Sequence, residues 1–135
     1  MGTLRSRHPN PRLIRDLVGL RMFQESPLVV VDVGARKGFE THWDHFGDQI
    51  FKIGFEPEPG SFEECVTLKS TENGVYYPFA LDRSAGHRNL FVCRYPSASS
   101  FLKSDNQMVE RLGMTDNFHV EEEIQVETID LDSFC

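Results

Sequence analysis

The sequence predicts an α/β fold in which short apolar strands alternate with helices. Three observations predict it: an apolar run at residues 28–31 that reads as a buried strand ending in a glycine turn, a second run at 51–55 that ends in an acid, and helical periodicity around them. The spacing between Asp32 and Glu56 is about what a strand, turn, helix and next strand require in an α/β unit. We therefore expect Glu56 at the carboxyl end of the second strand.

The other elements follow in chain order. Residues 1–11 are polar and are expected to be loose. Residues 39–46 predict a helix that ends near Gly47, residues 61–69 predict another helix, and residues 74–79 predict a third strand. Ahead of the first strand, apolar residues at helical spacing predict a packing helix: Leu13, Ile14, Leu17, Leu20 and Phe23.

Beyond residue 85 the pattern becomes hairpin-like, which predicts a β-rich insertion after the third strand. Residues 89–95 read as a strand, 106–112 as a helix and 120–128 as a second strand. In this last strand Val120, Ile124 and Val126 share one face, and acidic or polar residues take the other. The acids at 121–123 are typical of a strand edge that resists aggregation.

Composition is that of one globular unit with a single core: 135 residues, 39% hydrophobic and 26% charged. A formal charge of −7 opposes attraction to nucleic acid or to an anionic membrane, so neither is expected as a partner. Cys65, Cys93 and Cys135 are odd in number and widely separated, which favours unpaired thiols in a reducing compartment. No apolar segment approaches the length of a membrane span, and a cytoplasmic location is predicted.

The glycine turn predicts a cofactor site. Gly34 and Gly38 allow the main chain to turn sharply and approach a ligand closely, and free amides are expected to face that ligand. The start of the following helix favours a carboxylate or phosphate. Glu56 can accept hydrogen bonds from two ribose hydroxyls. The expected ligand is therefore an adenosine-like nucleoside with an anionic extension.

The glycine spacing selects among nucleoside cofactors. Dinucleotide sites usually carry Gly-x-Gly-x-x-Gly, whereas this chain has Asp32-x-Gly34-x-x-x-Gly38. The pattern resembles motifs I and II of S-adenosylmethionine-dependent methyltransferases with a Rossmann-like fold. Four blocks in order resemble the FkbM family of methyltransferases over residues 28–135: Val-Asp-Val-Gly-Ala-Arg-Lys-Gly, Gly-Phe-Glu-Pro-Glu-Pro, Pro-Phe-Ala-Leu-Asp and Glu-Thr-Ile-Asp-Leu-Asp-Ser-Phe.

The resemblance implies a three-layer α/β/α methyltransferase fold, with residues 1–26 as an N-terminal tail and packing helix and residues 27–135 as a partial S-adenosylmethionine-dependent domain. It also implies that the domain is C-terminally incomplete, because the family continues with a Lys-x-Asp-x-Glu-Gly type segment. The implied activity is methylation of a hydroxyl oxygen on a small-molecule or glycan acceptor. The insertion would roof a pocket, with acceptor contacts in the loop 97–100.

The resemblance also implies roles for single residues. Asp32, Gly34 and Gly38 would form the turn beside the methionine part of the cofactor, Glu56 would bind the ribose, and Asp82 would contact the adenine amine. Arg36 stands where the family commonly has Asn. No residue is assigned as catalytic.

Two other classes of function are weighed against methyl transfer. The chain could be a noncatalytic remnant or interaction module with a vestigial nucleoside pocket; an incomplete sheet would then expose the 29–33 edge and produce a homodimer or aggregate, unless the strand at 120–128 covers that edge. A nucleotide-dependent oxidoreductase ranks lower. No metal is expected, because His42 and His45 share a helical face without an evident third ligand.

Overall fold

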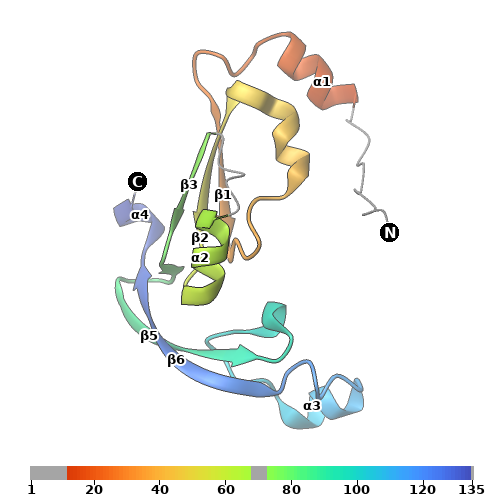
Figure 1. Ribbon diagram of the computed structural model, residues 1–135, viewed down its shortest axis with the longest axis vertical. Helices are drawn as coiled ribbons and strands as arrows, with labels where there is room; N and C mark the ends of the chain where they lie inside the picture. The colour runs from red at the N-terminus through yellow and green to blue at the C-terminus, as the bar shows by residue number, and fades with distance from the viewer. Residues whose placement is uncertain (1–11, 68–72, 135) are drawn as a thin grey trace. The chain divides into compact units, whose positions relative to one another are not determined.

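The computed structural model describes residues 12–67 and 73–134, and the chain divides into two compact units (Figure 1). The first unit ends at Pro78 and the second begins at Phe79. Each contains a three-stranded sheet, so the fold is mixed α/β, as the sequence predicts at this level. The predicted loose segment at residues 1–11 lies outside the described residues.

The sheet of the first unit is entirely parallel. Its strands are β1 (Leu28–Val33), β2 (Ile50–Phe55) and β3 (Gly74–Tyr77), in the order β1-β2-β3. Strand-forming valines dominate β1, and Pro27 precedes it. The carboxyl ends of β1 and β2 meet because Val33 pairs with Phe55. This pairing confirms the predicted parallel arrangement of the first two strands.

Two helical segments precede and follow β1. Helix α1 (Arg12–Gly19) packs on η1 (Thr41–Gln49), which is a 3-10 helix with a kink at Gly47 rather than the regular helix predicted over residues 39–46. The Gln49 side chain ties the two together, because its Nε2 donates to the Val18 carbonyl at 2.9 Å and its Oε1 accepts from the Phe23 amide at 3.2 Å. This contact joins α1 to the first unit, which ends at Pro78, and the division predicted after residue 26 stays a prediction.

Helix α2 (Pro59–Thr67) follows β2 directly. The Glu58 carboxylate accepts hydrogen bonds from the Gly60 amide at 2.9 Å and the Ser61 amide at 2.7 Å. It thereby pairs two of the amides that a helix start leaves without partners. Proline is favoured at a first helical position because its missing N–H costs nothing there. The end predicted at Lys69 lies outside the described residues.

The core of the first unit lies on one face of its sheet. Ala35, Phe39, Cys65 and Tyr76 are buried together, with Phe62 packed against them. The Phe39 and Tyr76 rings stack with centroids 4.5 Å apart, and the Tyr76 hydroxyl accepts a hydrogen bond from the Phe39 amide at 2.9 Å. The opposite face is open at β1.

That open face corrects the expectation of a buried first strand. The side chains of Val29, Val31 and Val33 are 56%, 39% and 62% exposed, and those of alternate residues are half-buried. The sequence run is uniformly apolar, and such runs are typical of parallel strands covered on both faces. Here only one face of β1 is covered, so the apolar run does not report burial.

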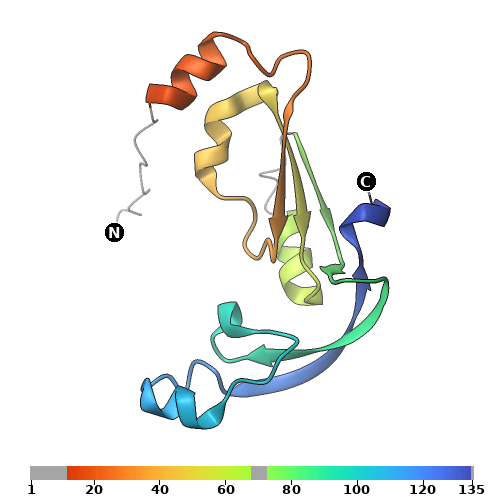
Figure 2. The ribbon, with the colours of Figure 1, turned by 180° about the vertical axis from the view of Figure 1, so that it is seen from behind.

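The second unit has a mixed sheet of β4 (Ala80–Leu81), β6 (Val120–Ile129) and β5 (Gly86–Cys93), in the order β4-β6-β5. Strand β6 pairs in parallel with β4 and antiparallel with β5, and the β5–β6 register shifts between Val92 and Cys93. The long two-stranded ribbon of β5 and β6 is plain from both sides (Figures 1 and 2). Its apolar face packs a small core: Ala80, Leu90 and Val126, with Val92, Phe101 and Ile124.

Three short helical segments complete the second unit: η2 (Pro96–Ala98), α3 (Asn106–Arg111) and α4 (Leu131–Phe134). The Asp105 side chain caps α3 by accepting hydrogen bonds from the Gln107 and Met108 amides. The first residues of α4 follow Asp130, whose carboxylate accepts from the Ser133 amide at 2.7 Å. None of the helices in the described residues is long and apolar enough to cross a membrane.

The predicted third strand forms but is shorter than expected, and the chain then passes to the second sheet. Strand β3 ends at Tyr77, and Ala80–Leu81 pairs instead with Thr128 and Ile129 of β6. The strand predicted over residues 74–79 is therefore confirmed over Gly74–Tyr77 and ends two residues earlier than predicted. Propensity alone cannot locate the break, because Pro78 and the residues around it suit either a strand end or a short interruption.

Candidate functional site

The candidate site is the turn that follows β1. After Val33 the chain adopts positive φ at Gly34 (79°), Lys37 (68°) and Gly38 (85°). The amides of Gly34 and Ala35 both donate to the Phe55 carbonyl, at 2.9 and 3.0 Å, which ties the turn to the end of β2. The turn therefore has the tight left-handed geometry that its glycines predict.

The amides of this turn are used within the protein. Besides the two bonds to Phe55, the Gly38 amide donates to the Ala35 carbonyl at 2.9 Å. The sequence predicted that free amides would face a ligand, and for Gly34, Ala35 and Gly38 that prediction is wrong. The following helix is the 3-10 helix η1, so the turn does not lead into the regular helix start on which the anion argument rested.

Position 34 requires glycine because of its backbone conformation and not because neighbouring atoms leave no room for a side chain. A Cβ built at Gly34 would have no neighbouring atom within 4 Å, yet its φ of +79° disfavours any L side chain. The space beside the turn at this point is therefore open to a bound molecule.

Glu56 lies directly beside the turn, at the end of β2. Its side chain is only 5% exposed, and its Oε1 accepts a hydrogen bond from the Glu58 amide at 3.0 Å. Burial raises the pKa of Glu56, while the Glu58 hydrogen bond and the charge of Arg36 act in the opposite direction. Burial therefore makes this carboxyl group harder to ionise than one in water.

Asp32 and Glu56 are electrostatically coupled. Burial and then the charge of Glu40 raise the pKa of Asp32, and Asp32 in turn contributes to the raised pKa of Glu56. The site is thus a concentration of carboxylates at the carboxyl edge of a parallel sheet. This is the position at which open α/β sheets bind ligands.

Arg36 is the cation of this acidic site. Its charge partly offsets the rise that burial causes in the pKa of Glu56. It also adds to the hydrogen bonds from Ser61 and Gly60 that lower the pKa of Glu58. Within the described part of the chain its buried Nε has no hydrogen-bond partner. A buried guanidinium donor without a partner is costly, so this atom has unused capacity for an anionic group.

Two features of the site were missed by sequence reasoning. Arg36 was noted only as a departure from a family pattern, although a cation inside an acidic turn is itself a signal. Cys65 on α2 is fully buried. Its Sγ donates to the Ala35 carbonyl at 3.0 Å and so fixes the turn against helix α2. Burial raises the pKa of this thiol, so it stays protonated and can donate.

Asp82 belongs to the second unit and is already paired there. One carboxylate oxygen accepts from the Arg83 amide at 2.8 Å and the other from Arg88 Nη1 at 2.6 Å. The Arg83 hydrogen bond and Arg88 together lower the pKa of Asp82. The structure therefore brings Asp32, Gly34, Gly38 and Glu56 together in the first unit, and an adenine contact by Asp82 stays a prediction.

The predicted acceptor loop also uses its hydroxyls internally. Ser99 Oγ accepts from the Cys93 amide at 3.0 Å, and Ser100 Oγ accepts from the Leu102 amide at 3.1 Å. These bonds shape the loop in the manner of serine turns. Among the described residues, no three His, Cys, Asp or Glu side chains form a group that could hold a metal ion.

Comparisons of the chain with protein-family models, with curated proteins and with solved structures found no match. The site is defined by its own geometry: a left-handed glycine turn tied to β2, two coupled carboxylates and one arginine with an unused donor.

Proposed function

We propose that this chain carries the cofactor-binding part of an S-adenosylmethionine-dependent methyltransferase of the FkbM type, with a Rossmann-like fold. The acceptor would be a hydroxyl oxygen of a small molecule or glycan. The observation that carries the proposal is the Gly34 turn, tied to the end of β2 with Glu56 buried beside it. Parallel strands that end in a glycine turn and an acid form the usual ribose-binding corner of α/β enzymes.

The residues present fit S-adenosylmethionine. The cofactor has a carboxylate, an ammonium and a sulfonium, and its adenosine carries two ribose hydroxyls. Asp32 would attract the cationic groups, Arg36 Nε would donate to the carboxylate, and Glu56 would accept from the ribose. The open space at Gly34 would admit the methionine part.

The paired amides of the turn favour this cofactor over a dinucleotide. A pyrophosphate is usually held by amides of the turn and by the start of a regular helix. Here the Gly34 and Ala35 amides are bonded to Phe55, and a 3-10 helix follows. A zwitterionic amino acid can instead be held by charged side chains, and Asp32 and Arg36 supply both signs.

When bound, the cofactor supplies the electrophilic methyl group. The role proposed for Asp32, Arg36 and Glu56 is to bind and orient it, since in-line displacement depends mainly on alignment of the two reactants. No described residue is assigned as the base that would take the hydroxyl proton.

A second candidate function is that of an interaction module with a vestigial nucleoside pocket. The observation that favours it is the exposure of Val29, Val31 and Val33 on β1, whose sheet partner is β2. An apolar strand at a sheet edge can add a strand from another chain.

The test is calorimetric titration of the chain with S-adenosylhomocysteine, with NADH as the competing ligand. We expect saturable binding that Glu56→Gln weakens about tenfold, because an amide cannot accept from both ribose hydroxyls as a carboxylate does. Glu63→Gln is the matched control, because Glu63 is exposed on helix α2 and its loss should leave affinity unchanged. A folded sample that binds NADH, or neither ligand, would contradict the methyltransferase proposal.

A further inference from the structure

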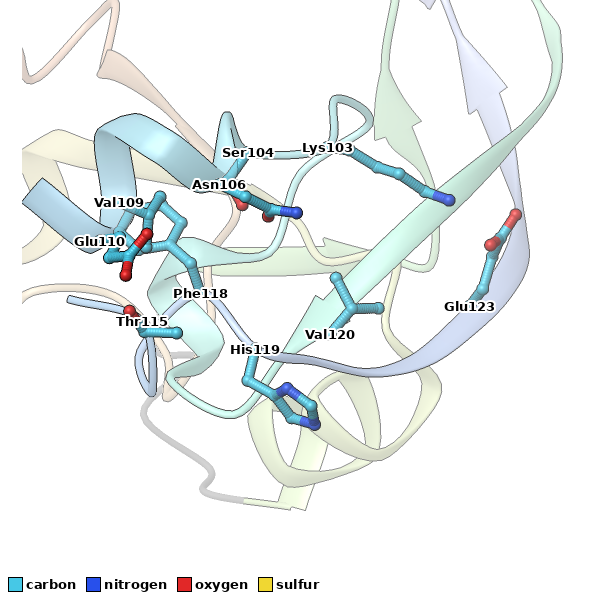
Figure 3. A pocket seen from close by; sticks show the side chains of 10 residues that line it. All are labelled: Lys103, Ser104, Asn106, Val109, Glu110, Thr115, Phe118, His119, Val120 and Glu123. Atoms are coloured by element: carbon cyan, nitrogen blue, oxygen red, sulfur yellow. The ribbon is translucent and has the colours of Figure 1, made fainter.

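The second unit contains a cavity of about 650 Å³ between α3 and the start of β6 (Figure 3). Its walls come from the segment before α3, from α3 itself and from the segment that leads into β6. The volume lies in the range of ordinary small-molecule sites. It is separate from the Ser99 and Ser100 hydroxyls predicted as acceptor contacts, which are not among its lining residues.

Backbone hydrogen bonds hold the walls of this cavity. Helix α3 ends at Arg111. Beyond it the Gly113 amide donates to the Glu110 carbonyl, and the Met114 amide donates to the Val109 carbonyl at 3.0 Å. Further along, the His119 carbonyl accepts from the Arg94 amide of the neighbouring segment at 2.8 Å. The cavity is therefore preformed by main-chain geometry, which lowers the ordering cost of binding.

The lining has an apolar base and a polar rim. Val109 is buried, and Phe118 and Val120 are half-buried. The exposed lining side chains are polar, and they include Asn106 and Thr115. A ligand that fits this lining presents both C–H surface and hydrogen-bonding groups.

The rim carries charges of both signs. Lys103 supplies an ammonium, whose Nζ lies 4.7 Å from the centre of the Phe91 ring. Glu110 and Glu123 supply carboxylates, and Glu123 Oε1 accepts from the Asn89 amide group at 2.8 Å. Two carboxylates against one ammonium disfavour an anionic ligand.

Hydroxyl groups match this rim because they both donate and accept. A carboxylate only accepts, an ammonium only donates, and the Asn106 amide and Thr115 hydroxyl do both. We propose that the cavity binds a neutral polyhydroxylated ligand of the sugar type. Binding of such a ligand stands on the cavity alone, whereas its role as methyl acceptor rests on the proposed function.

The test is an amide NMR titration of the 135-residue chain with methyl α-glucopyranoside and methyl α-mannopyranoside. We expect saturable shifts at Asn106, Thr115 and Val120 for at least one of them, at concentrations up to about 50 mM. The matching methyl glucuronide has the same ring and one carboxylate, and it should bind about tenfold more weakly than the neutral sugar. Tighter binding of the glucuronide would overturn the inference.

Two substitutions distinguish binding in the cavity from binding to the surface around it. Asn106→Ala and Glu110→Gln should each weaken binding about three- to tenfold, the cost of one lost hydrogen bond. Glu122→Gln removes the same charge from an exposed β6 residue outside the lining, and it should change nothing. An equal loss for Glu122→Gln, or no saturable shift for either neutral sugar in the folded chain, would overturn the inference.

Parallel titration with S-adenosylhomocysteine distinguishes this inference from the proposed function. Sugar binding without cofactor binding would support the cavity and contradict its role as an acceptor site. Cofactor binding without sugar binding would overturn the cavity proposal and leave the methyltransferase proposal standing.

Discussion

The two sheets of this protein expose different kinds of side chain to solvent. In the first unit, β1 lies at the edge of the sheet and exposes Val29, Val31 and Val33. In the second unit, the exposed residues of β6 are mostly acids, and cross-strand pairs join them to β5 and the segment after it: Glu123 with Asn89 and Glu121 with Arg94. Charged side chains on a strand oppose the addition of a strand from another chain, whereas exposed valine side chains do not.

The difference shows that the residues that make a segment form a strand are not the ones that keep this strand from pairing with another chain. Both sheets form from apolar and β-branched residues. Only the acidic ribbon also carries side chains that oppose pairing with another chain. The comparison can be tested by changes to packing, to edge chemistry, to ion pairing and to pH.

The largest expected effect is on packing in the first unit. A Cβ at Gly54 would overlap the Tyr76 ring, which is stacked on Phe39 and hydrogen-bonded to its amide. We expect Gly54→Ala to lower the free energy of unfolding by about 3 kcal/mol, because the buried ring cannot swing away. Urea unfolding followed by Trp43 fluorescence and by amide exchange would measure it.

The matched change in the second unit is Gly113→Ala. There a Cβ would meet no atom within 4 Å, and the cost comes only from a φ of +65°. We expect a loss of about 1 kcal/mol. Equal losses at the two glycines would contradict the packing interpretation of Gly54.

The second prediction concerns the edge of the first sheet. The chain should self-associate through β1, and Val31→Lys should weaken that association at least about tenfold, because a central lysine opposes edge pairing. Sedimentation velocity across a concentration series would show the change. Gln125→Lys, at an exposed position of β6, is the control and should leave the association unaltered. A monomeric parent chain at all concentrations would refute the pairing.

The third prediction compares the ion pair of buried Lys52 in the first unit with the two exposed ion pairs of Arg94 in the second. Lys52 is 3% exposed, and its Nζ lies 3.1 Å from Asp44 Oδ1 and 5.3 Å from the Phe39 ring centre. We expect Asp44→Asn to cost about 1–2 kcal/mol, because it removes the charge that compensates a buried ammonium. Arg94→Gln breaks exposed pairs with Asp116 and Glu121 and should cost less than about 1 kcal/mol. Denaturant unfolding of both variants measures the contrast, and a larger loss for Arg94→Gln would contradict it.

The smallest expected effect is a pH dependence of opposite sign for Glu56 and Asp32 in the first unit and for Asp82 in the second. Because the folded-state pKa of Glu56 and Asp32 is raised, their stabilising contribution is present at acid pH and is lost as pH rises through the raised pKa. Because the folded-state pKa of Asp82 is lowered, its contribution is present above the ordinary aspartate range and is lost as pH falls through the lowered pKa.

Amide exchange in each unit between about pH 3 and pH 7 would measure the two slopes. Glu56→Gln should flatten the slope in the first unit only, and Asp82→Asn should flatten it in the second unit only. A change of slope in the same direction for Glu56→Gln and for Asp82→Asn would contradict the assignment.

Much of the fold could be predicted from local patterns. The first two strands, their parallel order and the strand at 120–128 agree with the structure within a residue or two. The positive φ values at Gly34 and Gly38 also follow, because only a sharp turn explains glycines at the end of an apolar strand. These features depend on neighbours in the chain, which the sequence displays directly.

The pairing of the turn's amides could not be predicted in the same way. Which acceptor the Gly34 amide meets depends on the register of β2 against β1, and that register is a contact between segments distant in sequence. The same holds for the unused Nε of Arg36, whose burial depends on residues packed around the turn. The partner of each backbone amide is therefore known only once the three-dimensional structure is known.

By itself, then, the amino-acid sequence determined where strands form, where the chain must turn and which carboxylates stand at the strand ends. Only the tertiary structure decided that β1 is covered on one face, that the chain leaves the first sheet after Tyr77 and that α3 and β6 line a cavity open to solvent. The physical reason is range: backbone preference and periodicity act over a few residues, whereas burial and pairing depend on segments that meet only after folding.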